Sequence, residues 1–184
     1  VTSIYETVYR IKFTEMRTNN ILKRKCYDWV LEIVALLGLS CILSTLFFYG
    51  GFSNDEQIPI HFNSYGEVDG WGKPYYLLFF VVIGIIIYIA LGFTEKKYRH
   101  FNYPFKLPLG NVDIFYRLGV RLIRHLKALV MLFLGYLNVS MLLVIFGKTQ
   151  QLNMVGGIIF LLLVFGVLIF FTYKMFVVRN QFIS

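Results

Sequence analysis

The run Tyr75-Tyr-Leu-Leu-Phe-Phe-Val-Val-Ile-Gly-Ile-Ile-Ile-Tyr-Ile-Ala-Leu-Gly-Phe93 contains nineteen residues and no charged side chain. About twenty consecutive apolar residues form a helix long enough to cross the hydrocarbon core of a bilayer, which is roughly 30 Å thick. The run therefore predicts a membrane-spanning helix. Its length and lack of charge are the features by which further spans in the chain are identified.

Three further apolar runs, at residues 28–50, 125–146 and 154–176, have the same character. The whole chain of 184 residues is 58% hydrophobic and 15% charged, whereas soluble domains are about 25% charged. We therefore expect an all-α membrane protein, a single domain over residues 1–184 with four transmembrane helices. Asn138 inside the third span is expected to hydrogen-bond a neighbouring helix, because an unpaired amide in lipid is costly.

The basic residues predict an orientation. Sixteen of the eighteen Lys and Arg residues lie before the first span, between the second and third, or at the end of the fourth, and the other two are Lys73 and Lys148. Since basic residues accumulate on the cytoplasmic side, both termini are predicted to be cytoplasmic, an N-in/C-in arrangement. Residues 51–74 then form an extracytoplasmic cap between the first two helices, and residues 1–25 either an interfacial amphipathic helix or a frayed tail.

Arg117, Arg121 and Arg124 are spaced at i, i+4 and i+7, which places them on one face of the helix that leads into the third span. Such a face at the cytoplasmic surface is expected to bind anionic lipid headgroups, and docking of a protein partner is the alternative. The net charge of +8 is explained in the same way, because the basic residues flank apolar runs. Membrane lipids, and not nucleic acid, are the expected partners.

The cap is predicted to be hairpin-like. Apolar and other residues alternate over Ile58-Pro-Ile-His-Phe-Asn63, as in a short edge strand, and glycines at 66, 70 and 72 then supply turn conformations. Three cap residues are expected to contact a ligand or partner directly, namely His61, Glu67 and Trp71. Five are expected to shape the cap, namely Asn63, Gly66, Asp69, Gly72 and Lys73.

Two interpretations of the cap's acidic residues remain open. His61, Glu67 and Asp69 together form a candidate set of ligands for a divalent metal, although their spacing matches no standard motif. Alternatively, Asp69 and Asn63 accept backbone hydrogen bonds within turns, and Lys73 pairs with an acid near the membrane. The second interpretation is favoured, so neither a metal nor another cofactor is expected.

The sequence contains no Gly-x-Ser-x-Gly, His-Glu-x-x-His, phosphate-binding-loop or dinucleotide fingerprint. His100, Asp113 and His125 are scattered and form no nucleophile–base pair at a recognisable spacing. We therefore expect a protein that is not an enzyme.

The motif Ile58-Pro-Ile-His-Phe-Asn63, followed by Gly66-Glu-Val-Asp69 and Trp71-Gly-Lys73, resembles the domain-of-unknown-function 1648 family. This bacterial membrane domain often lies at the front of SdpI-type bacteriocin-immunity proteins. The resemblance covers roughly residues 30–90, and His100-Phe-Asn-Tyr-Pro104 is similar to the connector of stand-alone four-span members. It implies a multi-pass protein of the bacterial cytoplasmic (inner) membrane, with immunity or signalling roles in some relatives and no defined catalytic activity.

Taken together, these features predict a non-enzymatic inner-membrane protein of recognition, immunity or signalling type, whose cap binds a peptide toxin, an envelope component or a partner protein. One alternative is an accessory subunit of a larger membrane complex, docked through its lipid-facing aromatic residues. Another is a small transporter or metal-binding membrane protein. That alternative ranks last because the spans show no buried charge.

Overall fold

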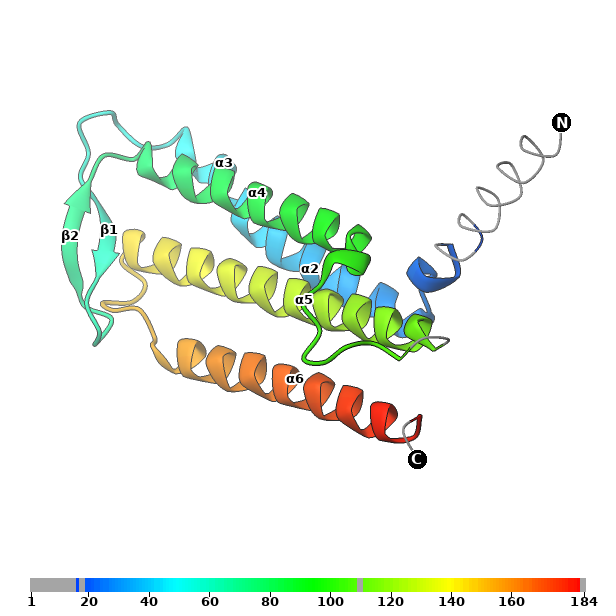
Figure 1. The fold of residues 1–184 in the computed structure, drawn as a ribbon. Helices are drawn as coiled ribbons and strands as arrows, with labels where there is room; N and C mark the ends of the chain where they lie inside the picture. The colour runs from blue at the N-terminus through cyan, green and yellow to red at the C-terminus, as the bar shows by residue number, and fades with distance from the viewer. Residues whose placement is uncertain (1–15, 17–18, 109–110, 183–184) are drawn as a thin grey trace, which may run out of the picture.

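The computed structural model describes residue 16 and residues 19–108 and 111–182. Most of the interfacial helix expected over residues 1–25 lies outside these described residues. The elements in chain order are α2 (Cys26–Leu43), α3 (Thr45–Tyr49), β1 (Ile58–Phe62), β2 (Val68–Gly72), α4 (Tyr76–Lys96), the short 3-10 helix η1 (Tyr98–His100), α5 (Val112–Ile145) and α6 (Val155–Asn180). Figure 1 shows long helices running side by side and the two-stranded hairpin at one end.

Among the described residues, four helical segments are long and apolar enough to cross a membrane, as predicted: Cys26–Tyr49, Tyr76–Lys96, Val112–Ile145 and Val155–Asn180. The third begins thirteen residues earlier than the span predicted at 125–146. At 1.5 Å per residue, the 34 residues of α5 extend about 51 Å, more than the roughly 30 Å of a hydrocarbon core. One end of α5 therefore projects beyond the apolar layer, and that end carries Arg117 and Arg121.

Helix α5 is central, because α2, α4 and α6 all pack against it. The closest crossing is with α2, where a Cβ placed on Gly38 would lie 2.2 Å from the carbonyl oxygen of Met131. Gly135 contributes from the other side, since its own Cβ would lie 2.8 Å from the carbonyl oxygen of Gly38. Small residues at a crossing allow two backbones to approach, which stabilises helix pairs in lipid through close packing.

A buried polar link crosses the same interface. The Thr45 hydroxyl donates to the side-chain oxygen of Asn138 at 2.8 Å, and the Asn138 amide donates to the carbonyl oxygen of Cys41 at 2.8 Å. The α2 helix ends at Leu43, just before Thr45, and Ser44 also donates to the Cys41 carbonyl. The prediction that Asn138 hydrogen-bonds a neighbouring helix is confirmed.

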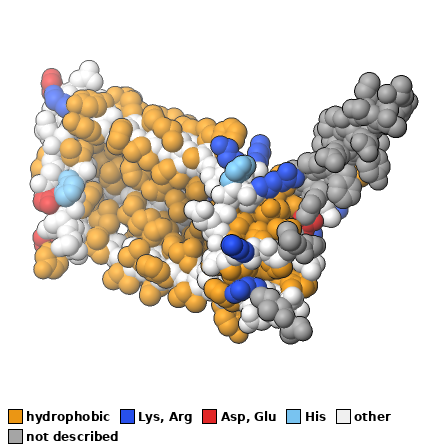
Figure 2. Space-filling model, in the orientation of Figure 1, with side chains coloured by type: hydrophobic (Ala, Val, Ile, Leu, Met, Phe, Trp, Pro, Cys, Tyr) orange, Lys and Arg blue, Asp and Glu red, His pale blue; other side chains and the backbone are white. Residues whose placement is uncertain are grey.

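The two ends of the molecule differ in charge. Figure 2 shows a broad hydrophobic band, with Lys and Arg side chains gathered mainly at the end opposite the hairpin. We call the two ends of the molecule the hairpin end and the basic end.

At the basic end, Phe115 and Leu118 of α5 pack against Phe171 and Met175 of α6. Burial raises the pKa of the nearby Tyr103 phenol, whose hydroxyl donates to the Tyr98 carbonyl at 3.1 Å.

Candidate functional site

The hairpin is antiparallel, with Ile58 opposite Gly72 and Phe62 opposite Val68. Ile58 is 1% exposed, and a Cβ on Gly72 would lie 2.5 Å from the Ile60 side chain, so this face of the hairpin is packed. The prediction that Gly72 supplies a glycine-specific turn conformation is wrong. Its φ angle is not in the positive range, and the restriction comes from neighbouring side chains.

The turn between the strands is organised by Asn63. Its side-chain oxygen accepts the backbone N–H groups of Tyr65 at 2.9 Å and Glu67 at 3.0 Å, and its amide donates to the Glu67 carboxylate at 2.9 Å. Gly66 in this turn has a φ of +85°, as the glycine pattern predicted. The prediction that Asp69 accepts backbone hydrogen bonds in the turn is wrong, because Asn63 provides that acceptor and Asp69 points to another partner.

The turn is also attached to the rest of the molecule. The backbone N–H of Leu152, in the link between α5 and α6, donates to the carbonyl oxygen of Gly66 at 2.7 Å. A Cβ on Gly66 would lie 2.0 Å from the carbonyl oxygen of Leu152, so no larger residue fits without movement. The hairpin, which lies in the connection between α3 and α4, is thus attached to the connection between α5 and α6. This attachment fixes the position of its outer face.

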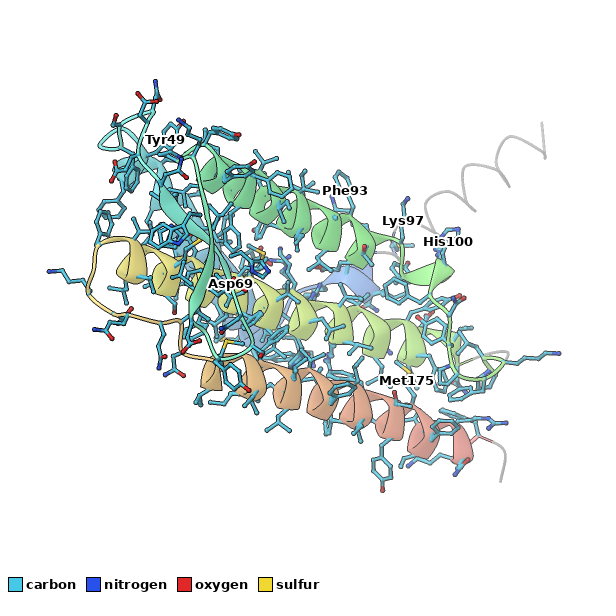
Figure 3. All side chains as sticks on the ribbon, turned by 90° about the vertical axis from the view of Figure 1, so that its left-hand side faces the viewer. Tyr49, Asp69, Phe93, Lys97, His100 and Met175 are labelled. Carbon is cyan, nitrogen blue, oxygen red and sulfur yellow. The ribbon has the colours of Figure 1, made fainter. Side chains whose placement is uncertain are left out.

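The outer face carries the exposed side chains. His61 Nδ1 and Asp69 Oδ1 are 2.6 Å apart, with side-chain exposures of 71% and 43%. Trp71 is 61% exposed and Tyr65 in the turn is 78% exposed. Figure 3 shows Asp69 on the hairpin, far from Lys97 and His100 beyond the other end of α4. Asp69 and Trp71 are both exposed positions of β2, so the imidazole–carboxylate pair and the Trp71 ring can donate, accept and provide apolar contact on one open surface. Tyr65 adds a second exposed ring in the turn.

Two further predicted cap residues have clear roles. Lys73 donates to the carbonyl oxygen of Asn54 at 3.0 Å and to the Asp55 carboxylate at 3.2 Å, so its predicted pairing with an acid is confirmed. Glu67 bonds to Asn63 and does not join His61 and Asp69. Within the described residues, no group of three or more His, Cys, Asp or Glu side chains is placed to hold a metal ion.

A buried ionic cluster at the basic end was not predicted. Arg124 is 5% exposed and donates to Glu95 through Nε at 2.9 Å and through a terminal nitrogen at 2.6 Å. The same terminal nitrogen, Nη2, also donates to the Leu22 carbonyl at 2.8 Å. The other terminal nitrogen, Nη1, lies 3.1 Å from the Asp28 carboxylate. The guanidinium group of Arg124 thereby joins α5 to three other segments, namely the one before α2, α2 itself and α4.

The cluster continues one turn along α5. Lys127 donates to Glu32 at 2.7 Å, and the Tyr88 hydroxyl donates to the same carboxylate oxygen at 2.5 Å. Arg24 lies 3.1 Å from the other Glu32 oxygen and 3.6 Å from Glu95. Three carboxylates face three cations, so the cluster is electrically balanced and its main effect is to hold α2, α4 and α5 together.

This cluster corrects two predictions. Arg124 does not serve as a headgroup ligand, because its donors are occupied by Glu95, Asp28 and the Leu22 carbonyl. The statement that the spans contain no buried charge is also wrong, since Asp28, Glu95, Arg124 and Lys127 are all buried. Sequence spacing placed the arginines on one helix face correctly, but it could not show which acids of other helices lie opposite.

The segment from α2 through the hairpin to α4 also has a relative among known families. Residues 35–87 match the family model described as Domain of unknown function (DUF1648). The predicted resemblance is confirmed for this segment, and its most polar part is the hairpin described above. No curated protein matches the chain, and no solved structure does. The DUF1648 segment thus contains the whole hairpin, while Leu152, which fixes the turn, lies outside the matched residues.

Proposed function

We propose that this chain is a non-enzymatic recognition protein of the bacterial cytoplasmic membrane, in which the hairpin is an extracytoplasmic binding surface for immunity or signalling. The observation that carries the proposal is the combination of a fixed backbone with an exposed outer face. Trp71 and Tyr65 extend from a hairpin that Asn63 and Leu152 hold in place. A surface ordered before binding loses less conformational entropy, and aromatic side chains dominate many binding sites.

The orientation in this proposal rests on the distribution of charge. Among the described residues, Lys73 and Lys148 are the basic side chains that belong to the hairpin-end loops, and the remaining Lys and Arg residues lie toward the basic end. The positive-inside rule assigns the basic end to the cytoplasm. The hairpin would then face the periplasm or the outside, where a peptide toxin, an envelope component or a partner protein is encountered.

The non-enzymatic part of the proposal is supported by the openness of the outer face. The His61–Asp69 pair has the form of a base with an orienting carboxylate, but both side chains are substantially exposed. Catalytic groups usually act in concave sites from which water can be excluded. On a solvated hairpin the same pair is better suited to hydrogen bonding with a ligand.

The proposal is tested by affinity purification from native membranes in mild detergent, comparing the wild type with Trp71→Ala. Trp29 offers a matched control, since it is 56% exposed and lies at the basic end. We expect Trp71→Ala to lose a partner that both the wild type and Trp29→Ala retain. Equal recovery with all three proteins would contradict recognition through the hairpin.

An accessory-subunit role is the second candidate. Helix α6 packs mainly against α5 and leaves most of its apolar surface exposed, including Leu162 at 68% and Ile169 at 68%. Such a surface is covered either by lipid or by another membrane helix. A stoichiometric partner that survives detergent, and that Trp71→Ala does not release, would favour this candidate.

A further inference from the structure

A basic cavity lies at the end of the molecule opposite the hairpin. It has a volume of about 390 Å³ and is formed between the segment that precedes α2 and the first turns of α5. Five basic residues line it: Lys23, Lys25, Arg117, Arg121 and Arg124. Ile21 and Val120, both buried, contribute apolar wall. The cavity is therefore a concave site at the edge of the apolar layer, and all of its charged lining residues are positive.

Four of the five basic residues of this cavity have no acidic ion-pair partner among the described residues. Arg124 at its inner side is neutralised by Glu95 and Asp28. Within the described part of the chain, Lys23, Lys25, Arg117 and Arg121 form no ion pair, and the Arg121 guanidinium lies 5.2 Å above the Tyr27 ring. Four cations from two chain segments thus share one space, in contrast to the paired cations of the neighbouring cluster.

Uncompensated like charges repel one another, and the repulsion is relieved when an anion binds between them. A phosphate monoester suits this site, because it carries about −1.5 to −2 charge at pH 7 and has three acceptor oxygens. Arginine binds phosphate oxygens with two parallel N–H donors, and lysine adds a compact charge. The four-residue spacing of Arg117 and Arg121 lets both guanidinium groups approach the same anion.

We propose that this cavity binds one phosphate monoester anion, held by Arg117 and Arg121 from α5 and by Lys23 and Lys25 from the preceding segment. Two sources share this chemistry, the headgroup of a phosphatidic-acid-type lipid and a soluble phosphate. The proposal is independent of the hairpin's function, since it concerns the other end of the molecule. It also differs from diffuse attraction to a membrane surface, because it specifies one ligand per chain.

The test is calorimetric titration of the purified full chain in non-ionic detergent, with dihexanoyl phosphatidic acid in one arm and inorganic phosphate in the other. Wild-type protein is expected to bind one ligand per chain. Arg117→Gln with Arg121→Gln should weaken binding at least tenfold. The matched control is Lys97→Gln with Lys106→Gln, which removes the same charge from exposed residues of the same end and should change affinity less than twofold.

The two arms separate the sources. Comparable affinity for inorganic phosphate and for the short-chain lipid assigns the site to a soluble phosphate, and binding of the lipid alone assigns it to a headgroup. Lys23→Gln with Lys25→Gln provides a second pocket variant on an exposed segment, in case the α5 variant does not fold. The proposal is overturned if neither probe binds saturably to the wild type, or if pocket and control variants weaken binding equally.

Discussion

The carbonyl oxygen of Gly66 accepts a hydrogen bond of 2.7 Å from the backbone N–H of Leu152. These residues lie in the hairpin turn and in the link between α5 and α6, so the bond joins the two connections at the hairpin end. It fixes the turn by backbone atoms alone, with Gly66 at a φ of +85° and no space for a Cβ beside Leu152. The outer face of the hairpin depends on this contact for its position.

Gly66→Ala should therefore destabilise the protein by more than conformational strain alone. A non-glycine residue in the left-handed region costs about 1–2 kcal/mol, and loss of the bond to Leu152 adds about 1 kcal/mol. Gly147→Ala is the matched control, because Gly147 has a φ of +65° but open space around it. Thermal unfolding in detergent should show the larger loss for Gly66→Ala, and equal losses would contradict a role for the Leu152 contact.

Asn63→Ala should also destabilise the fold, by about 1–3 kcal/mol, because two backbone donors in the turn lose their acceptor. Asp69→Leu should cost less than about 1 kcal/mol, since the exposed pair with His61 is worth little to stability. The same unfolding measurements, repeated with EDTA, should show no effect of the chelator. A reversed order of the two variants, or a chelator-sensitive wild type, would restore Asp69 as a structural or metal-binding residue.

Arg124→Met should lower the free energy of unfolding by about 3–5 kcal/mol, because it leaves Asp28 buried without its cation and Glu95 with only the more distant Arg24. Arg117→Met, on the same helix but without an ion pair in the described residues, should change it by less than about 0.5 kcal/mol. Denaturation in mild detergent, followed by circular dichroism, measures both. Similar losses for the two variants would mean that the buried cluster does not hold the helices together.

The proposed orientation predicts which side of the membrane each end faces. Cysteine introduced by Ser64→Cys in the hairpin turn, in a background with Cys26→Ala and Cys41→Ala, should react with an impermeant maleimide on intact cells. Cysteine introduced by Asn102→Cys, in the exposed connection at the basic end, should react only after the membrane is permeabilised. The opposite pattern would place the hairpin in the cytoplasm and refute the recognition proposal.

The spans were predictable because each apolar run is long enough to cross a bilayer by itself, whatever the other helices do. The helix that leads into the third span was also predicted, and α5 does run without a break from Val112. The burial of Arg124 within it was not predictable. Arg124 can be buried there because Glu95 and Asp28, which belong to other helices, neutralise its charge. Glu95 lies 29 residues away in the sequence. Hydropathy along one segment contains no information about such partners.

For the candidate site, the local turn chemistry was predictable, whereas the contacts with distant segments were not. The need for glycine at position 66 follows from local turn chemistry, and the structure agrees. The contact with Leu152 joins segments that the sequence does not relate, and it uses backbone atoms that have no residue-specific signal. Asn63 and Asp69 are both good turn acceptors, and only the strand register, with Asp69 on the outer face beside His61, decides between them.

The most direct test of recognition through the hairpin is photo-crosslinking in living cells, with p-benzoylphenylalanine in place of Trp71 and, as the control, in place of Trp29. Recognition through the hairpin predicts a discrete adduct from position 71 that position 29 does not give, and that His61→Ala combined with Asp69→Ala removes. Identical products from both positions, or an adduct at 71 that is unchanged by the loss of His61 and Asp69, would contradict it.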